Sequence, residues 1–314
     1  MPNAFFRREL NSILESNNSL ILKKVIPRVN YYFRRSTKFN PSGDEFISLR
    51  DLSCFKKSAY YYDLRSVLRY FPSDLKFQCW LRDVITVPDE PGFVKCRPID
   101  QDNANSTILK LNQVRHYRKI DDRNSFSGKK AKLVWRGSVH QRGWRAEFLK
   151  KLHDNPLCDV GALKGTGGLA GNHYEKEFLS INEQLKYKFI FSIEGADVAT
   201  NLKWIAQSNS LCFMKKPKHE SWFMENSLIP DFHYVLVDEN FDDLSKKIQY
   251  YLDNPHEAEV IISNFQKFYS QFEDDTSEKL IALLVALKYF YLSGQLSLKR
   301  YGLGFLESDF LGSN

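Results

Sequence analysis

The chain has 314 residues, of which 43% are hydrophobic and 26% charged, with a formal net charge of +7 and a pI near 9.0. This composition excludes an intrinsically disordered chain, and the length is sufficient for two domains with separate cores. The excess of Lys and Arg favours an anionic partner, whether nucleic acid, an anionic lipid surface or a phosphorylated substrate.

The five cysteines are widely spaced and form no CxxC pair, so neither a disulfide framework nor a zinc site is expected. Apolar surroundings indicate reduced thiols, which are typical of the cytoplasm. No signal peptide is recognisable. The longest apolar run, residues 280–292, carries Lys288 and is too short to cross a bilayer. We therefore expect a cytoplasmic protein.

Residues 1–35 form a basic, amphipathic segment, in which Phe6, Leu10, Ile13 and Leu14 share one helical face. Such a helix could lie on an anionic membrane surface. The commoner alternative is a helix that packs on its own domain and leaves its basic face in solvent.

Residues 44–127 have α/β character, with a strand region over 77–87 and a Pro- and Gly-marked loop after it. The polar stretch 121–130 is the expected linker. The sequence therefore predicts an N-terminal domain over residues 1–127 and a C-terminal domain over 128–314.

A strand over residues 132–135 ends at an Arg-Gly-Ser tripeptide, and Arg142 and Arg145 stand near the start of the helix that follows. Bidentate guanidinium groups with a free backbone N–H suit a diphosphate. Any one of these arginines alone would be an ordinary surface residue. The five glycines of residues 161–172 do not match GxxxxGK, which excludes a Walker phosphate loop.

A βαβ unit is predicted next, with strands over residues 189–193 and 211–214. The first strand closes at Gly195, which can take a positive φ, and Asp197 is the expected N-cap of the helix. Such a turn points a helix N-terminus at a ligand over the strand ends and suits a phosphate. A βαβ unit that only holds a sheet together is an equally good interpretation.

The C-terminal third alternates a strand over residues 233–237 with a helix capped by Asp242 or Asp243, and a second helix begins at Pro255. A final apolar helix over 277–292 is expected to pack back toward the N-terminal domain. The alternation predicts two α/β domains, each with a largely parallel sheet.

Four segments together resemble glycosyltransferase family 90, most closely its bacterial lipopolysaccharide core transferases. They are LVWRGS, KYKFIFSIEGADVATNLKW, the stretch from Trp222 that ends LIPDFHYVLV, and Asn254-Pro-His-Glu-Ala. The resemblance implies a GT-B fold, in which two Rossmann-like domains face each other across a cleft. It further implies an inverting transfer of a hexose, glucose or galactose, from a UDP-sugar to the inner core of lipopolysaccharide. It implies no metal or other cofactor, and a place in the cytoplasm or peripheral on the inner membrane.

Carried over residue by residue, the resemblance puts the donor in the C-terminal domain, and we add Glu220 as a ribose contact. The animal members carry serine and arginine where this chain has Ala199 and Asn201, so Thr200 and Lys203 are expected to compensate. On the acceptor side we expect Lys95 and Arg97. The complete donor set is Arg136, Gly137, Ser138, Arg145, Gly195, Ala199, Thr200, Asn201, Lys203 and Glu220.

The expected general base is Asp83, because Leu81 to Pro88 resembles the family's R-D-Y-P-Q-V-P context. An inverting transfer needs one carboxylate to take the proton of the acceptor hydroxyl. Asp89 and Glu90 are the next candidates. Departing UDP would be stabilised by a helix N-terminus and arginines, without a cation.

Two alternatives remain. Asp100-Gln101-Asp102 is a DxD pattern, by which metal-dependent GT-A transferases hold their cation. A nucleic-acid-binding protein would also explain the positive charge, but no nucleic-acid motif is present and the basic residues are scattered. We expect no nucleic-acid partner.

Overall fold

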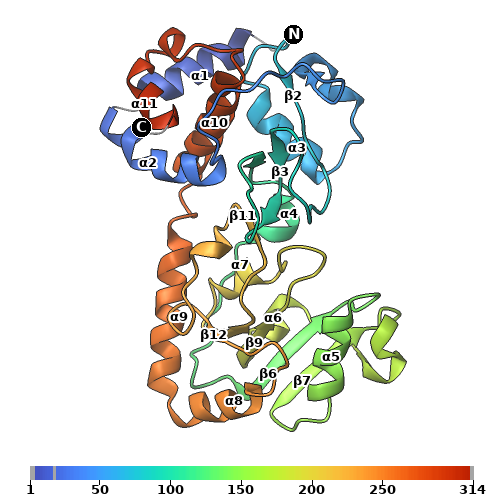
Figure 1. Cartoon of the computed structure of the whole chain (residues 1–314). Helices are drawn as coiled ribbons and strands as arrows, with labels where there is room; N and C mark the ends of the chain where they lie inside the picture. The colour runs from blue at the N-terminus through green and yellow to red at the C-terminus, as the bar shows by residue number, and fades with distance from the viewer. Residues whose placement is uncertain (1–3, 17–18, 312–314) are drawn as a thin grey trace. The chain divides into compact units, whose positions relative to one another are not determined.

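The computed structural model describes residues 4–16 and 19–311, and the chain divides into two compact units. Unit 1 comprises Met1–Val114, Lys218–Met224 and Phe272–Asn314, and unit 2 comprises Arg115–Pro217 and Glu225–Gln271. The ends of the two expected domains, residues 1–3 and 312–314, lie outside the described residues, as do residues 17–18. Figure 1 traces the chain by residue number.

Unit 2 is built on a six-stranded sheet in which every pairing is parallel. Along the sheet the order is β12-β10-β9-β6-β7-β8, so the chain winds outward from β6 in one direction and from β9 in the other. This is the 3-2-1-4-5-6 order of doubly wound nucleotide-binding folds. The strands are β6 (Lys130–Gly137), β7 (Cys158–Leu163), β8 (Glu175–Lys176), β9 (Tyr187–Ser192), β10 (Leu211–Met214) and β12 (Val235–Leu236).

The central strands read as continuous apolar runs because both of their faces are covered. Phe189, Ile190 and Phe191 of β9 are all fully buried, as is Phe213 of β10. The strands predicted over 132–135, 189–193 and 211–214 are confirmed. The strand predicted over 233–237 is shorter than expected and pairs only through Val235 and Leu236.

The helices of unit 2 pack on this sheet, with α5 beside β7 and α9 beside β10 (Figure 1). Phe148 of α5 meets Phe191 of the sheet at 4.5 Å between ring centroids, which anchors the helix to the core. The predicted helix start at Pro255 is confirmed, since proline suits the first helical position. The helices are α5 (Gly143–Leu152), α6 (Ile181–Gln184), α7 (Leu202–Ile205), α8 (Leu244–Asp253) and α9 (Pro255–Ser270).

The helix predicted from Asp197 is wrong in its extent. Residues 196–201 form bends, and α7 begins only at Leu202. Asn201 explains the delay, because its Nδ2 donates to the carbonyl of Phe191 at 2.9 Å and its Oδ1 accepts from Ser192 Oγ at 3.1 Å. Such side-chain bonds compete with helical ones and tie the segment to the end of β9.

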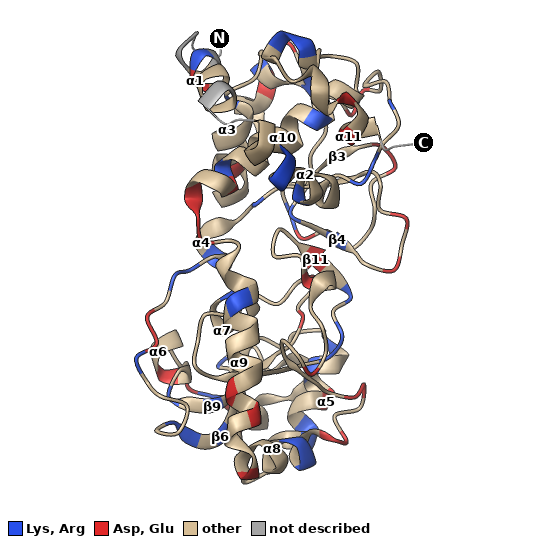
Figure 2. Ribbon diagram, turned by 90° about the vertical axis from the view of Figure 1, so that its left-hand side faces the viewer, with Lys and Arg blue, Asp and Glu red and all other residues tan. Residues whose placement is uncertain are grey.

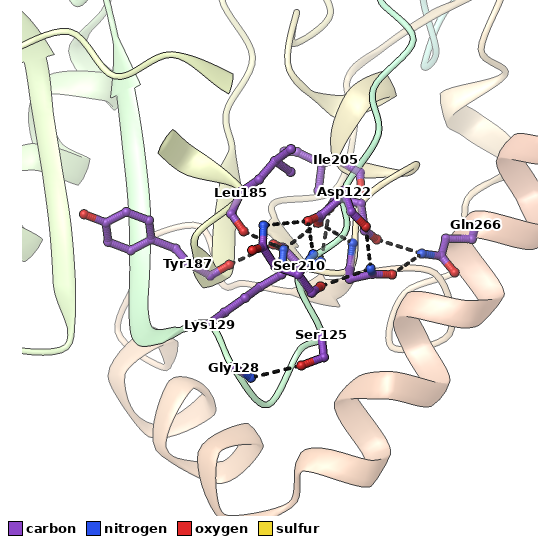
Figure 3. A network of polar contacts seen from close by, with 12 residues as sticks. Asp122, Ser125, Gly128, Lys129, Leu185, Tyr187, Ile205, Ser210 and Gln266 are labelled. Atoms are coloured by element: carbon purple, nitrogen blue, oxygen red, sulfur yellow. Dashed lines mark hydrogen bonds and ion pairs between the residues drawn. The ribbon is translucent and has the colours of Figure 1, made fainter. Parts of the chain in front are cut away.

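The amino ends of the central strands are joined by a buried polar network (Figure 3). Lys129, just before β6, donates from Nζ to Asp122 Oδ2 at 2.5 Å, to the carbonyl of Leu185 at 2.6 Å and to Ser210 Oγ at 2.8 Å. Ser210 Oγ in turn donates to the carbonyl of Tyr187 at 2.7 Å. The network therefore links the residues that lead into β6, β9 and β10.

Unit 1 is mainly helical, and its strands are only two or three residues long. They pair as β1 with β2, β3 with β5, and β4 with β11, and only the β3–β5 pair is parallel. The expectation of a second, largely parallel sheet is therefore wrong. The strands are β1 (Ile47–Ser48), β2 (Lys76–Phe77), β3 (Gly92–Val94), β4 (Cys96–Pro98), β5 (Ser106–Ile108) and β11 (His219–Ser221).

The strand region predicted over 77–87 is likewise wrong. Strand β2 ends at Phe77, Cys79 makes an isolated bridge to Phe93, and the chain then runs irregularly to β3. Pro88 and Pro91 lack the N–H that a ladder needs.

The helices of unit 1 gather around α10, which packs against α2 and α3. The predicted final helix is confirmed, although it begins slightly earlier, where Asp274 accepts from the backbone N–H groups of Thr276 and Ser277. No helix in the described ranges is both long enough and apolar enough to cross a membrane. The helices are α1 (Ala4–Ser16), α2 (Ser19–Tyr32), α3 (Ala59–Leu68), α10 (Asp275–Leu292) and α11 (Glu307–Leu311), with a short α4 (Gln113–His116) and the 3₁₀ turn η1 (Leu49–Cys54).

Candidate functional site

The winding direction of the unit 2 sheet reverses between β6 and β9, which are neighbours. In open parallel sheets, ligands bind outside the carboxyl ends of the strands at this reversal. The loop from β6 into α5 and the segment after β9 both start at this edge. The topology alone therefore makes it the first candidate site.

Arg145, in the first turn of α5, ties the ends of the two strands together. Its Nη1 donates to the carbonyl of Ser138 at 2.7 Å, on the β6 side. On the β9 side, Nη2 donates to Ile193 O at 2.9 Å and Nε to Glu194 O at 3.0 Å. The backbone of this edge is thus fixed by a cation.

The guanidinium groups of Arg145 and Arg142 lie together beside Gly195. Burial and the neighbouring guanidinium groups of Arg142 and Arg115 lower the pKa of Arg145 to about 10, so it remains protonated at neutral pH. The N-terminus of α5, a ten-residue helix, adds partial positive charge at the same place. Such a cluster favours an anion, and a diphosphate most of all.

Gly195 lies directly beside these arginines. The expectation of a positive φ is wrong, since Gly195 is not among the residues with positive φ. A Cβ at this position would lie 3.4 Å from Arg145 Nη2 and 3.9 Å from Arg142 Nε. The absence of a side chain therefore keeps the guanidinium groups uncovered. Gly137 has a packing role instead, because a Cβ there would come within 2.6 Å of the Trp135 ring.

Arg136 points to the outer strands of the sheet. Its Nη2 donates to Asp159 Oδ1 at 2.8 Å, and its Nε donates to the carbonyl of Glu177 at 3.0 Å. Burial opposes ionisation of Asp159, yet hydrogen bonds from Tyr187, Arg136 and Lys176 hold the pKa of that carboxyl below its usual range. In this structure Arg136 links β6 to β7 and β8.

The remaining donor candidates of unit 2 lie in or after the bends that follow β9. Ala199 is buried, Thr200 is half-buried, and Asn201 holds the segment to the strand. Lys203 is fully buried, and its Nζ is 2.5 Å from Glu225 Oε1. Its ammonium is therefore neutralised inside the unit.

Glu220 belongs to unit 1, whereas the other donor candidates belong to unit 2. Its carboxylate accepts from Arg97 Nε at 2.7 Å, from Arg34 Nη2 at 2.9 Å and from the hydroxyl of Tyr31. Arg97 is fully buried and also donates to the carbonyls of Tyr31 and Ser106. The pair joins β4 to β11 and holds the core of unit 1 together.

Asp83 is a half-exposed carboxylate with fixed partners in unit 1. Its Oδ1 accepts from Lys95 Nζ at 2.8 Å and from the hydroxyl of Tyr60 at 3.1 Å. The Asp83 side chain is 43% exposed, whereas that of Lys95 is 4% exposed. Nothing in the sequence singled out Tyr60, which α3 delivers from more than twenty residues away. A carboxylate fixed in this way, yet open to solvent, can accept a proton from a bound hydroxyl.

The DxD residues form a turn. Asp102 Oδ1 accepts from the backbone N–H of Ala104 at 3.2 Å, and both Asp100 and Asp102 are exposed. Among residues 4–16 and 19–311, no group of three or more His, Cys, Asp or Glu side chains is arranged to hold a metal ion.

Comparison with known proteins gives one family and two relatives. The family model for glycosyl transferase family 90 matches residues 107–278, a range that includes the whole of unit 2. The chain is 48% identical over 237 residues to O-glucosyltransferase LpsA of Dichelobacter nodosus, covering 76% of this chain and 74% of that protein. It is 31% identical over 146 residues to Protein O-glucosyltransferase 2 of Danio rerio, covering 44% of this chain and 28% of that protein.

Proposed function

This chain belongs to glycosyl transferase family 90 and is a glycosyltransferase, and we propose that it moves a hexose from a UDP-sugar to the inner core of lipopolysaccharide. Glucose is the expected hexose, because the relative from Dichelobacter nodosus is named an O-glucosyltransferase. Galactose is the alternative. The proposed location is the cytoplasm, with peripheral contact at the inner membrane.

The observation that carries the proposal is the pair Arg142 and Arg145, which lie together beside Gly195 at the reversal of the sheet. In this proposal the diphosphate of the donor lies against Arg142, Arg145 and the N-terminus of α5. Gly195 leaves room for it. Thr200 and the bends around it flank the nucleotide, whereas Arg136 and Lys203 act by holding the surrounding backbone.

The proposed reaction inverts the anomeric carbon. Asp83 takes the proton of the acceptor hydroxyl while the hydroxyl oxygen attacks C1 of the hexose. The bond from C1 to the diphosphate oxygen breaks, and the charge left on UDP is stabilised by the arginines of unit 2. Lys95 and Tyr60 keep the carboxylate of Asp83 oriented. The proposal assigns the acceptor to unit 1 and the donor to unit 2, in a GT-B arrangement.

The nucleic-acid alternative receives no support from the distribution of charge. Lys and Arg are spread along both units (Figure 2). A binding surface for nucleic acid would concentrate them on one face or in one groove.

Two variants measured side by side test the proposal. Asp83→Asn keeps the shape of the side chain and removes the proton acceptor, so transfer should slow by about two to four powers of ten while UDP affinity stays unchanged. Arg142→Ala should weaken UDP binding by roughly ten- to a hundredfold, since a charge-assisted hydrogen bond is lost. Transfer rates with UDP-glucose and UDP-galactose, and UDP affinity by calorimetry, are measured for both variants.

The matched controls are Asp89→Asn, a neighbouring carboxylate, and Lys132→Ala, which removes the same charge from an exposed site on unit 2. Near-normal transfer by Asp83→Asn would move the base to Asp89 or Glu90. Unchanged UDP affinity in a folded Arg142→Ala protein would remove the donor from this edge of the sheet.

A further inference from the structure

Unit 1 contains a second basic site, in a cavity of about 380 Å³ between η1, α3 and the chain that follows α3. Arg50, in the first turn of η1, lines one side of it. Arg65 and Arg69, four residues apart at the end of α3, line another. Three guanidinium groups from two elements thus border one hollow.

No acidic residue is among the described residues that line this cavity. The carboxylate of Glu9 interacts electrostatically with Arg69, but one of its oxygens already accepts from Lys279 at 2.9 Å and from Tyr70 at 3.1 Å. Arg69 lies over the ring of Phe6 at 4.4 Å, which holds its guanidinium at the rim. The cavity is therefore lined by positive charge, and the Arg69 guanidinium is held in place by its contact with Phe6.

The floor of the same cavity is apolar. Leu52, Leu68 and Phe71 are buried side chains that line it, and Phe6 of α1 lines it as well. Ser53 and Ser73 also line the cavity. A ligand that fits must combine a group of negative charge with an apolar portion.

We propose that this cavity binds the phosphate of an anionic phospholipid headgroup. Arg50, Arg65 and Arg69 would contact the phosphate oxygens, and the first part of the glycerol and acyl chain would lie on the apolar floor. Guanidinium groups are suited to phosphate by their fork of donors.

A vesicle-binding experiment on the full chain tests the assignment. The protein is titrated with vesicles of phosphatidylcholine alone and of phosphatidylcholine mixed with phosphatidylglycerol. The triple variant Arg50→Ala, Arg65→Ala, Arg69→Ala should bind the mixed vesicles about a hundredfold more weakly, since each basic residue near the surface contributes roughly 1 kcal/mol. The control Lys132→Ala, Lys150→Ala, Lys246→Ala removes the same charge from exposed sites on unit 2 and should bind like the wild type.

A second variant separates the cavity from simple surface charge. Ser53→Trp keeps all three arginines but fills the cavity with a large side chain. It should therefore weaken binding to the mixed vesicles by roughly tenfold or more, because the headgroup can no longer enter the cavity and loses a charged hydrogen bond. Thermal unfolding verifies that each variant is folded. Equal loss in the two triple variants, or unchanged binding by Ser53→Trp, would overturn the proposal. Inorganic phosphate is added as a competitor. If it displaces the protein from the mixed vesicles at a concentration equal to that of the anionic lipid, the cavity binds a soluble phosphate and the lipid assignment is overturned.

Discussion

Lys288 shows how one residue can set the pH dependence of stability. It lies in the middle of α10, is 2% exposed, and donates to Asn30 Oδ1 at 2.8 Å and to the carbonyl of Phe33 at 2.7 Å. Burial lowers its pKa to about 8, from a reference value of 10.5. Between these two values the unfolded chain binds the proton more tightly than the folded one.

The free energy of unfolding should therefore contain a contribution from Lys288 that rises with pH between about 8 and 10.5. The penalty is full below about pH 8 and disappears as pH rises to about 10.5. Lys288→Met should flatten this part of the profile, measured as the free energy of urea unfolding across that pH range. Lys246→Met, at an exposed position, should leave the profile unchanged. Parallel profiles for the wild type and Lys288→Met would show that Lys288 is not the group responsible.

Single residues also mark the limit of what the sequence could predict. It pointed to Arg142 and Arg145 at a strand end, and both lie at the reversal of the sheet. The sequence could not show that Arg136 pairs with Asp159, because the contacts of a side chain at the end of a strand depend on which strands lie beside it. It also placed Glu220 with the donor, whereas the strand pairing of β11 with β4 puts it in unit 1.

At the scale of elements, the network around Lys129 fixes the amino ends of three strands of the unit 2 sheet (Figure 3). The side chains of Lys129 and Asp122 are both almost fully buried. Removal of one member of a buried ion pair leaves the other charge uncompensated and typically costs about 3–5 kcal/mol.

Lys129→Met should consequently destabilise the protein by about that amount, measured by chemical unfolding. Its UDP affinity under conditions where it is folded should be retained, because the proposed donor site is at the opposite, carboxyl end of the same strands. Lys186→Met, an exposed neighbour in sequence just before β9, is the matched control and should change stability by less than about 0.5 kcal/mol. A loss of stability equal to that of the control would show that the pair contributes nothing.

The strands of unit 2 were largely predictable and those of unit 1 were not. The unit 2 strands are short apolar runs joined by nearby helices, so each is visible in a local window. In unit 1 the partners are distant: Arg97 of β4 lies opposite Glu220 of β11, 123 residues later. Neither segment alternates apolar and polar residues clearly enough to predict that pairing.

At the scale of the whole molecule, we expect the protein's own cations to stabilise the negative charge that develops on departing UDP. Transfer should then persist in EDTA, measured with the same assay as above, because the proposed mechanism gives the stabilisation of the leaving group to Arg142 and Arg145 and not to a metal. Asp102→Ala should likewise transfer at the wild-type rate. Loss of activity in EDTA that manganese restores, together with an inactive Asp102→Ala, would favour the metal-dependent alternative.

The composition of unit 1 from three separate stretches governs the order in which a nascent chain can fold. Lys288 of α10 donates to the carbonyl of Phe33 across 255 residues of sequence. At typical rates of protein synthesis, the N-terminal helices therefore wait roughly 10–50 seconds on the ribosome for their partner. Unit 2 is complete by Gln271 and can assemble first. During that interval the apolar face of α2, with Leu22, Ile26 and Val29, is available to chaperones before α10 emerges to cover it.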